Sequence, residues 1–145
     1  MADVEITDKS HALIKGLQQA VDRALESIGI AAQGYATLAC RVDTGRLRNS
    51  ITYATAKGQG QPNKFKSTGK QDKKGKNKRA VMASPADYAM LGKPEENSVW
   101  LGTNVEYARH VEEKVKAFIR PAIMDNISDY KNILEENLRA LDGGD

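Results

Sequence analysis

The fold is decided by residues 10–39, which read SHALIKGLQQAVDRALESIGIAAQGYATLA. Apolar residues recur at every third or fourth position from Leu13 to Ala39, and this spacing predicts one continuous amphipathic helix. Such a helix has about 30 residues and is roughly 45 Å long. Ser10 is the expected N-cap, and Gly29 is the expected position of a bend or break. A helix of this length either packs within its own domain or projects against a neighbouring subunit, and the sequence leaves both possibilities open.

A second stretch, residues 57–79, reads KGQGQPNKFKSTGKQDKKGKNKR and differs in composition from the rest of the chain. Its nine cationic residues and one aspartate give it a net charge of +8, whereas the whole chain carries +3 and the remainder therefore −5. Glycines and polar residues prevent this basic segment from burying a core, so we expect a flexible loop or the tip of a long hairpin. Its candidate contacts to a partner or polyanion are Lys57, Lys64, Lys66, Lys70, Lys73, Lys74, Lys76, Lys78 and Arg79.

Length and composition indicate one domain, residues 1–145, with a core of its own. Hydrophobic residues make up 40% of the chain but aromatic residues only 6%, which predicts an aliphatic core. The N-terminal residues are polar and partly acidic, unlike a secretory signal peptide, so we expect synthesis or assembly in a cytoplasm. Cys40 is the single cysteine, and its apolar neighbours indicate a small buried side chain.

Shorter patterns predict the remaining elements. They are a short helix at Arg46–Asn49 capped by Asp43 or Thr44, a strand from Ile51 to Thr55 and a returning strand at 80–83. An irregular connection at 84–97 leads to a strand at 98–103 and a short helix at 105–113. The last helix runs from Pro121 to Leu141, and Gly143 and Gly144 end it. The predicted class is α+β, with a long N-terminal helix and a C-terminal helix packed on a small antiparallel sheet, and with a long basic loop.

The residue patterns that support catalysis or metal binding do not occur in this sequence. His11 and His110 lie far apart on different predicted helices, and neither has a second ligand at helical spacing. Adjacent residues on a helix, such as Glu112 and Glu113, point in different directions and cannot act as an acid–base pair. The glycine spacing of 69–75 resembles a phosphate loop, but the terminal Lys-Ser/Thr pair is missing. We therefore expect no enzymatic activity, no cofactor and no metal ion.

The basic segment is open to three interpretations. Its net charge can bind the phosphates of duplex DNA by counterion release, with a steep dependence on salt. It can also dock on an acidic neighbouring protein during assembly, or serve as a solvated loop that improves solubility. Phe65 is the only aromatic residue in the segment, so the stacking platforms of a single-strand binder are not expected.

Three short stretches resemble motifs of one protein family. Residues 44–51, TGRLRNSI, are similar to T-G-x-L-R-x-S-I. Residues 101–108, LGTNVEYA, with Glu112 further on, are similar to V-G-(T/S)-N-x-x-Y-A-x-x-x-E, and residues 117–122, AFIRPA, to P-F-L-R-P-A. In this order the three stretches resemble the siphophage tail-component proteins of the gene-product-ten-like group, which act in the neck or in head–tail joining. The family-motif positions are Thr44, Gly45, Arg46, Leu47, Arg48, Ser50, Gly102, Thr103, Asn104, Tyr107, Ala108, Glu112, Arg120 and Pro121.

The resemblance implies a structural virion protein of a tailed phage, found in the neck or tail and assembled in the bacterial cytoplasm. It implies a homo-oligomeric ring, of six or twelve copies by analogy, that contacts other connector or tail proteins. Packaged DNA is a transient contact in this interpretation, and no membrane is involved. A tail-terminator subunit is an alternative, and so is a nucleic-acid-binding accessory protein that uses the lysine-rich segment without sequence preference.

The resemblance also implies mainly structural roles for the matching residues. Gly45 is expected to form a tight turn, and Arg46 and Arg48 to clamp acidic groups. Thr103 and Asn104 are expected to end a strand and cap the helix that follows.

On that helix, Tyr107, Ala108 and Val111 are expected to pack on the core. Arg120 falls at the start of the last helix, where a cation opposes the helix dipole, so it is expected to pair with a carboxylate.

Overall fold

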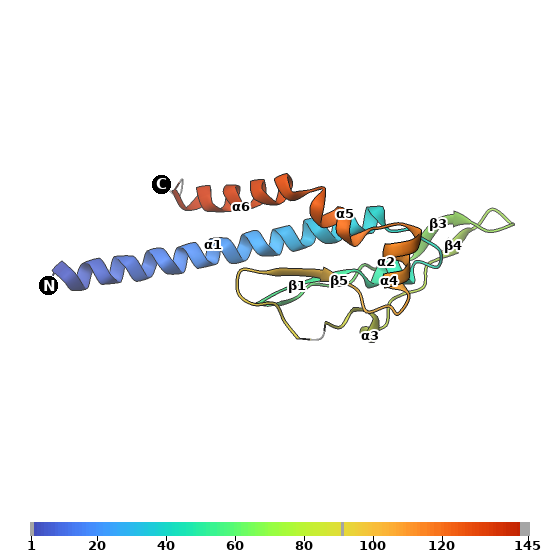
Figure 1. Ribbon diagram of the computed structural model, residues 1–145, viewed down its shortest axis with the longest axis horizontal. Coiled ribbons are helices and arrows are strands. Elements are labelled where there is room, and N and C mark those ends of the chain that lie inside the picture. Colours follow the sequence, from blue (N-terminus) through green and yellow to red (C-terminus); the bar gives the residue numbers. More distant parts are fainter. Residues whose placement is uncertain (1, 91, 143–145) are drawn as a thin grey trace.

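The computed structural model describes residues 2–90 and 92–142, which form the predicted α+β fold (Figure 1). The helices are α1 (Ala2–Ala39), α2 (Arg46–Ser50), α3 (Pro85–Tyr88), α4 (Ala108–His110), the π-helix η1 (Val111–Val115), α5 (Ile119–Met124) and α6 (Ile127–Asp142). The strands are β1 (Thr52–Thr55), β2 (Gly58–Gln59), β3 (Ser67–Gln71), β4 (Asn77–Arg79) and β5 (Val99–Gly102). The glycines expected to end the last helix lie outside the described residues.

Helix α1 runs without interruption along most of the length of the molecule (Figure 1). Two expectations about it are wrong: Ser10 lies inside the helix and does not cap it, and Gly29 does not break it. The buried side of α1 consists of small residues at four-residue spacing, with Ala20, Ala24 and Ala36 fully buried. Because these side chains are short, the sheet and the C-terminal helices approach the α1 backbone closely, and this packing stabilises the helix.

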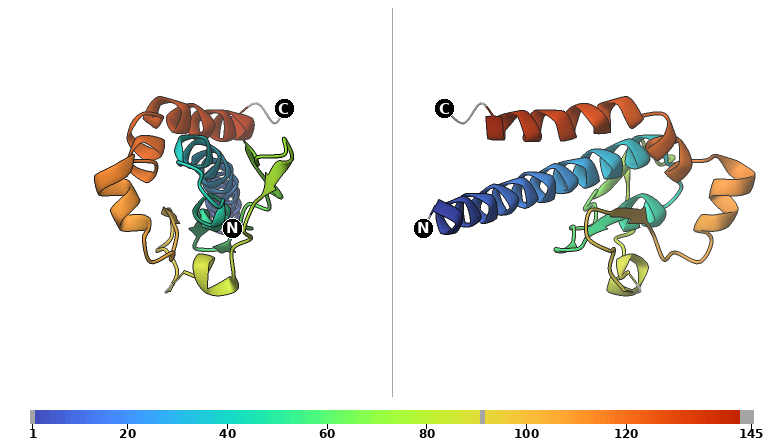
Figure 2. Two further views of the ribbon diagram at one scale, coloured as in Figure 1. Left: turned by 90° about the vertical axis from the view of Figure 1, so that its right-hand side faces the viewer. Right: turned by 60° about the vertical axis from the view of Figure 1, so that its left-hand side comes forward.

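Strand β1 is the centre of a three-stranded antiparallel sheet in the order β2-β1-β5. Ala54 pairs with Gln59 on one side and with Trp100 on the other. All four residues of β1 are buried, because α1 covers one face and the connection that contains α3 lies below the other (Figures 1 and 2).

The ring of Tyr53 fixes the separation between α1 and the sheet. An added Cβ atom at Gly29 would lie 2.3 Å from this ring, and one at Gly60 would lie 2.2 Å from it. The ring is therefore held between two glycine backbones. Its hydroxyl donates a hydrogen bond to Glu26 on α1. Burial, followed by this hydrogen bond, raises the pKa of Tyr53 to about 12, so the donor is retained at physiological pH.

The predicted last helix is divided into α5 and α6. The side-chain amide of Asn126 donates to the carbonyl of Ala122 at 3.1 Å, and Tyr130 donates to the same carbonyl. Side chains that bond to backbone carbonyls compete with helix continuation, which explains the break. Helix α6 then runs back along α1, and Leu141 packs over Gly16 (Figures 1 and 2).

The core cluster is mainly aliphatic, as predicted, and contains one aromatic residue. Phe118 is the largest fully buried side chain, and it packs with Ile51, Leu47 and Ala122 in one cluster. Cys40 belongs to the same cluster, as predicted, and burial raises the pKa of its thiol to about 11.

Two further element predictions are wrong. No strand forms at 80–83, because the returning strand β4 ends at Arg79 and Val81 instead donates to the carbonyl of Thr44 at 2.7 Å. The helix expected at 105–113 begins only at Ala108 and continues as the π-helix η1 to Val115.

The close approach at Gly29 can be tested by adding a single methyl group. We expect Gly29→Ala to lower the free energy of unfolding by about 2–4 kcal/mol, because Tyr53 cannot move away from the new Cβ without meeting Gly60. Urea unfolding followed by circular dichroism measures the change.

Gly34→Ala is the matched control on the same helix, because an added Cβ there meets no atom within 4 Å. We expect this control to be stabilised by about 0.5–1 kcal/mol, as an alanine in a helix interior is. Equal behaviour of the two variants would contradict the role given to Tyr53.

Candidate functional site

The basic segment folds as a hairpin, which is one of the two forms that the sequence predicts. Strands β3 and β4 pair antiparallel, with Ser67 opposite Arg79 and Gln71 opposite Asn77. The hairpin extends beyond the body at the end opposite the α1 N-terminus (Figure 1). We call residues 64–79 the basic arm. It holds eight of the nine predicted cationic contacts and one acidic residue, a net charge of +7.

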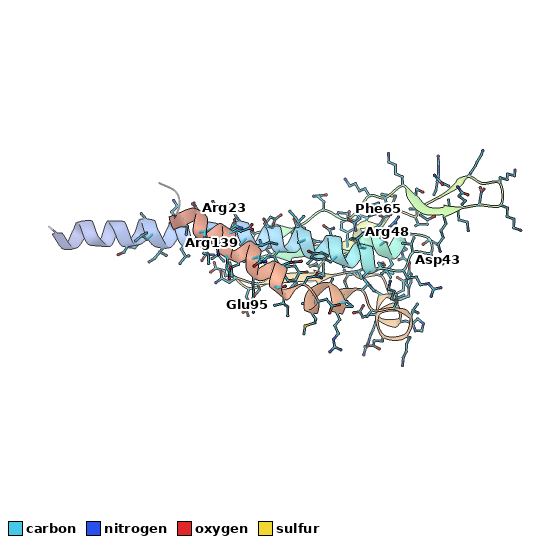
Figure 3. All side chains as sticks on the ribbon, turned by 90° about the horizontal axis from the view of Figure 1, so that it is seen from above. Arg23, Asp43, Arg48, Phe65, Glu95 and Arg139 are labelled. Carbon is cyan, nitrogen blue, oxygen red and sulfur yellow. The ribbon has the colours of Figure 1, made fainter. Side chains whose placement is uncertain are left out.

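The cationic side chains of the basic arm are exposed and point outward from the ribbon (Figure 3). None of them pairs with a carboxylate in the described part of the chain. Lys57, at the start of the segment and outside the arm, approaches Asp22 of α1 at 3.7 Å. The positive charge of the arm is therefore available to an external partner.

The single carboxylate of the basic arm organises its tip. Asp72 accepts hydrogen bonds from the backbone N–H groups of Lys74 and Lys76, at 2.8 and 2.9 Å. Gly75 has a φ of 80°, which suits glycine at this turn. Asp72 is thus engaged by the turn, and the lysines around it stay free.

The base of the arm is fastened to the body through Asn49. This side chain is fully buried and donates to the carbonyls of Phe65 and Val81, at 3.1 and 3.0 Å, one on each side of the hairpin. Its carbonyl oxygen accepts from the Phe65 N–H at 2.9 Å. One buried amide therefore holds both ends of the arm in register.

Arg48 reinforces the same junction. Its Nη2 donates to the carbonyl of Ser67 at 2.7 Å, and its guanidinium lies 4.2 Å from the centre of the Phe65 ring (Figure 3). This is a cation–π contact and not the clamp on an acidic group that the resemblance implied.

Arg46 does clamp acidic groups, as expected, but within its own chain. Its guanidinium binds both oxygens of Asp87, at 2.8 and 3.1 Å, and both oxygens of Glu106, at 3.0 and 3.1 Å. Asp87 is buried, and the hydrogen bonds from Arg46 hold its pKa at about 2. Tyr107 is exposed and lies under the same guanidinium, 5.7 Å away, so it does not pack on the core as expected.

The second motif, residues 101–108, connects the end of β5 to α2 and to the segment after α3 through hydrogen bonds. Thr103 accepts from the Val105 N–H at 3.1 Å and shares a hydrogen bond of 2.5 Å with Ser50. Asn104 donates to the carbonyl of Ala89 and does not cap the following helix, so that expectation is wrong. The motif residue Gly102 ends β5.

The third motif, residues 117–122, is held at its start by a carboxylate that lies before it in the sequence. The Glu112 carboxylate accepts hydrogen bonds from the N–H groups of Phe118, Ile119 and Arg120, at 2.6, 3.0 and 2.8 Å. Burial opposes its ionisation, but these donors outweigh burial and lower the pKa of Glu112. The Arg120 guanidinium forms no ion pair within the described residues, so the expected carboxylate pairing is absent there, and Pro121 lies inside α5.

The remaining motif residues are structural. Gly45 precedes α2 with a φ of 85°, and a Cβ there would lie 2.9 Å from Ala80, so the position favours glycine for two reasons. Neither Asp43 nor Thr44 caps α2 through its own side chain as predicted, although Thr44 Oγ1 accepts from the Arg46 N–H at 3.3 Å. Leu47, Ala108 and Val111 pack in or against the core.

Among the apolar surfaces that the described residues leave uncovered are two that lie far apart on the subunit. On the N-terminal half of α1, Leu13, Ile14 and Leu17 are 74%, 65% and 47% exposed. At the other side of the body, a groove of about 510 Å³ lies between β5, α4 and α5, and its lining includes the exposed Ile123 and Met124. We call these the α1 surface and the α5 groove.

Within the described residues, no group of three or more His, Cys, Asp or Glu side chains is arranged to hold a metal ion. No helix in that part of the chain combines the length and apolar character needed to cross a membrane.

Several residues that build the site have no sequence pattern that marks them as site residues. Asp87, Glu106 and Tyr53 have no local signal, because their partners lie 27 or more positions away. Asn49 occupies a variable position of the first motif. The Asp-x-x-Gly spacing of Asp72 and Gly75 is a turn signal that could have located the arm tip.

Comparison of the chain with protein families, with curated proteins and with solved structures found no significant match.

The Arg46 clamp predicts a specific dependence of stability on pH. We expect Arg46→Met to lower the free energy of unfolding by about 1–2 kcal/mol at pH 7, because Asp87 stays buried without its main partner. The pKa of Asp87 is lower in the folded protein than in the unfolded chain, so its ionised carboxylate stabilises the folded state above about pH 4, the range of an ordinary Asp pKa. This stabilisation is lost as the pH falls through about 2. The difference between wild type and variant should therefore shrink between pH 4 and pH 2, as measured by urea unfolding.

Arg41→Met is the control for the lost charge, because Arg41 is exposed and has no ion pair in the described residues. A pH-independent difference for Arg46→Met, or an equal effect of Arg41→Met, would contradict the clamp.

The Asn49 anchor can be tested by amide hydrogen exchange. We expect Asn49→Ala to cost about 2–3 kcal/mol and to accelerate exchange at Phe65, Ala80 and Val81, whose N–H groups bond at the base of the arm. Asn77→Ala, on the exposed face of β4, should change neither quantity. Unchanged protection in Asn49→Ala would show that the arm is held by other contacts.

Proposed function

We propose that this protein is a structural subunit of a tailed-phage virion that assembles into a ring at the neck, as a head–tail connector or tail-completion protein. The observation that supports the proposal best is the pair of uncovered apolar surfaces on one elongated subunit. The three family-like motifs supply the viral context. The mechanism is interlocking of identical subunits, and it involves no catalysis.

Exposure of the α1 surface to water is unfavourable in free energy, because its side chains are apolar. Leu13, Ile14 and Leu17 form one stripe on the helix, and large contiguous apolar patches on soluble proteins usually mark contact sites. Leu141 of α6 adds to the apolar area at the same end and is 41% exposed. A second copy of the chain is the occupant that we propose for this surface.

The α5 groove supplies the complementary surface. It lies near the opposite end of α1, so one chain cannot cover its own α1 surface with it (Figure 1). Contacts between two different surfaces are heterologous, and heterologous contacts form a ring when the rotation between successive copies closes and an open filament when it does not. A closed ring is the arrangement that we propose. Insertion of the α1 stripe of one copy into the α5 groove of the next would bury both apolar surfaces.

The residues of the family-like motifs support a subunit with a rigid body. The Arg46 clamp, the Glu112 cap and the Asn49 anchor connect the body internally, so these motif residues are not free for a partner. Assembly is therefore assigned to the α1 surface, which lies outside the motifs, and to the α5 groove, whose lining includes the motif residues Gly102, Thr103, Ala108 and Arg120.

The test is the oligomeric state of the purified protein as a function of concentration. We expect mass photometry to show a discrete oligomer, and we expect Leu13→Gln combined with Leu17→Gln to dissociate it. Glutamine retains helix propensity, so the loss would come from the apolar contact and not from the helix.

Leu38→Gln is the matched control, because Leu38 is 84% exposed in the last turn of the same helix, away from the α1 surface. It should leave the oligomer intact. A wild-type chain that remains monomeric at all concentrations, or a double variant that assembles normally, would contradict the proposed self-assembly.

A further inference from the structure

The basic arm is a preformed element with a different chemistry from the apolar surfaces. We propose that it binds the phosphate backbone of double-stranded DNA, without reading the base sequence. This inference goes beyond ring assembly, because the arm is complete in a single subunit. It rests on four properties of the arm: its free charge, its anchoring, its shape and its residue types.

The charge of the arm is concentrated and unneutralised. Residues 64–79 carry a net charge of +7, and none of the cationic side chains pairs with a carboxylate in the described residues. The only acidic group, Asp72, accepts two backbone N–H donors of the turn. Lysines that are held close together without counter-charges displace the condensed counterions of DNA on binding, which drives association.

The arm is attached at a defined position. Asn49 binds the backbone at Phe65 and Val81, and Arg48 binds the carbonyl of Ser67. The segment that leads into the arm is also fixed, since Asn63 donates to Thr37 of α1 at 2.7 Å and to the carbonyl of Arg48 at 2.9 Å. A binding element that is already ordered loses less conformational entropy when it meets its ligand.

The shape of the arm suits duplex DNA. It is a two-stranded antiparallel ribbon that extends from the body by about 20 Å, given the rise of roughly 3.3 Å per strand residue. The major groove of B-DNA is about 12 Å wide and admits such a ribbon, with lysines of both strands near the flanking phosphates. The major groove of duplex RNA is narrow and deep, so the same ribbon does not fit there.

The residue types favour phosphate contacts over base recognition. Seven of the eight cationic residues of the arm are lysines, which are flexible point charges. The planar or amide donors that commonly read bases are represented in the arm by Gln71, Asn77 and Arg79. Single-strand binders stack successive bases on several aromatic rings, but the arm has one aromatic ring, Phe65, which lies at its base against the Arg48 guanidinium and is 42% exposed. The arm therefore selects duplex over single-stranded DNA.

Fluorescence anisotropy tests the inference with a labelled 20-bp duplex of arbitrary sequence, titrated with the full-length protein at several salt concentrations. We expect salt-dependent binding, with log K falling against log salt at a slope of about −4 to −5 for roughly five phosphate contacts. The tip variant Lys73→Gln/Lys74→Gln/Lys76→Gln keeps Asp72 and Gly75. It should weaken binding at least about tenfold and make the slope shallower by about 3.

The matched control is Lys93→Gln/Lys114→Gln/Lys131→Gln, which removes the same charge from three exposed lysines outside the arm. It should bind with the wild-type slope. Single-stranded DNA of the same length and duplex RNA should both bind more weakly than the DNA duplex.

Mass photometry of the tip variant separates this inference from the proposed function. The tip variant should form the same oligomer as wild type, because the arm does not take part in the apolar contacts. Loss of the oligomer with unchanged DNA binding would overturn the inference and assign the arm to an acidic protein partner. Equal losses in the tip variant and the control, tighter binding of single strands or of RNA, or no salt-dependent duplex binding would overturn it as well.

Discussion

The structure depends on the ring of Tyr53, which is held between the backbones of Gly29 and Gly60. No side chain larger than hydrogen fits at either glycine, so this contact sets how closely α1 approaches the sheet. The same contact explains why a glycine in the middle of a long helix does not break it: the lost helix propensity is offset by tertiary packing. Strand β1 follows α2 with only Ile51 between them. The contact that places the sheet against α1 therefore also places the first motif and, through it, the base of the basic arm.

The first motif is a structural junction. Within a few residues, Gly45 turns the chain, Arg46 clamps Asp87 and Glu106, Arg48 covers Phe65, and Asn49 holds both ends of the basic arm. These partners lie in the basic arm and at its base, in α3 and in the segment that precedes α4. A short helix whose side chains point to several elements can therefore join the body, the arm and the α3 connection.

The surfaces with functional potential lie outside that junction and differ in chemistry. The α1 surface and the α5 groove are apolar, whereas the basic arm carries free positive charge at the end of the molecule opposite the α1 N-terminus (Figure 1). Apolar contacts are insensitive to moderate salt, while phosphate contacts weaken steeply with it. The two proposed activities, self-association through the apolar surfaces and reversible DNA binding through the basic arm, can therefore be measured separately.

The sequence by itself determined the α+β class, the long first helix, the two main strands, the burial of Cys40 and the charge of the basic segment. These follow from local periodicity and composition. Tertiary structure alone decided the continuity of α1 at Gly29, the break at Asn126, the π-helix at Val111–Val115 and the place of Phe118 at the core centre. It also decided that Arg46 faces Asp87 and that Asn49 faces the arm, because these partners are brought together by folding across 16 to 41 positions of the chain. Residue types and their spacing in the sequence indicate which residues can form a contact. Only the packing of elements that are distant in the sequence determines which contacts form.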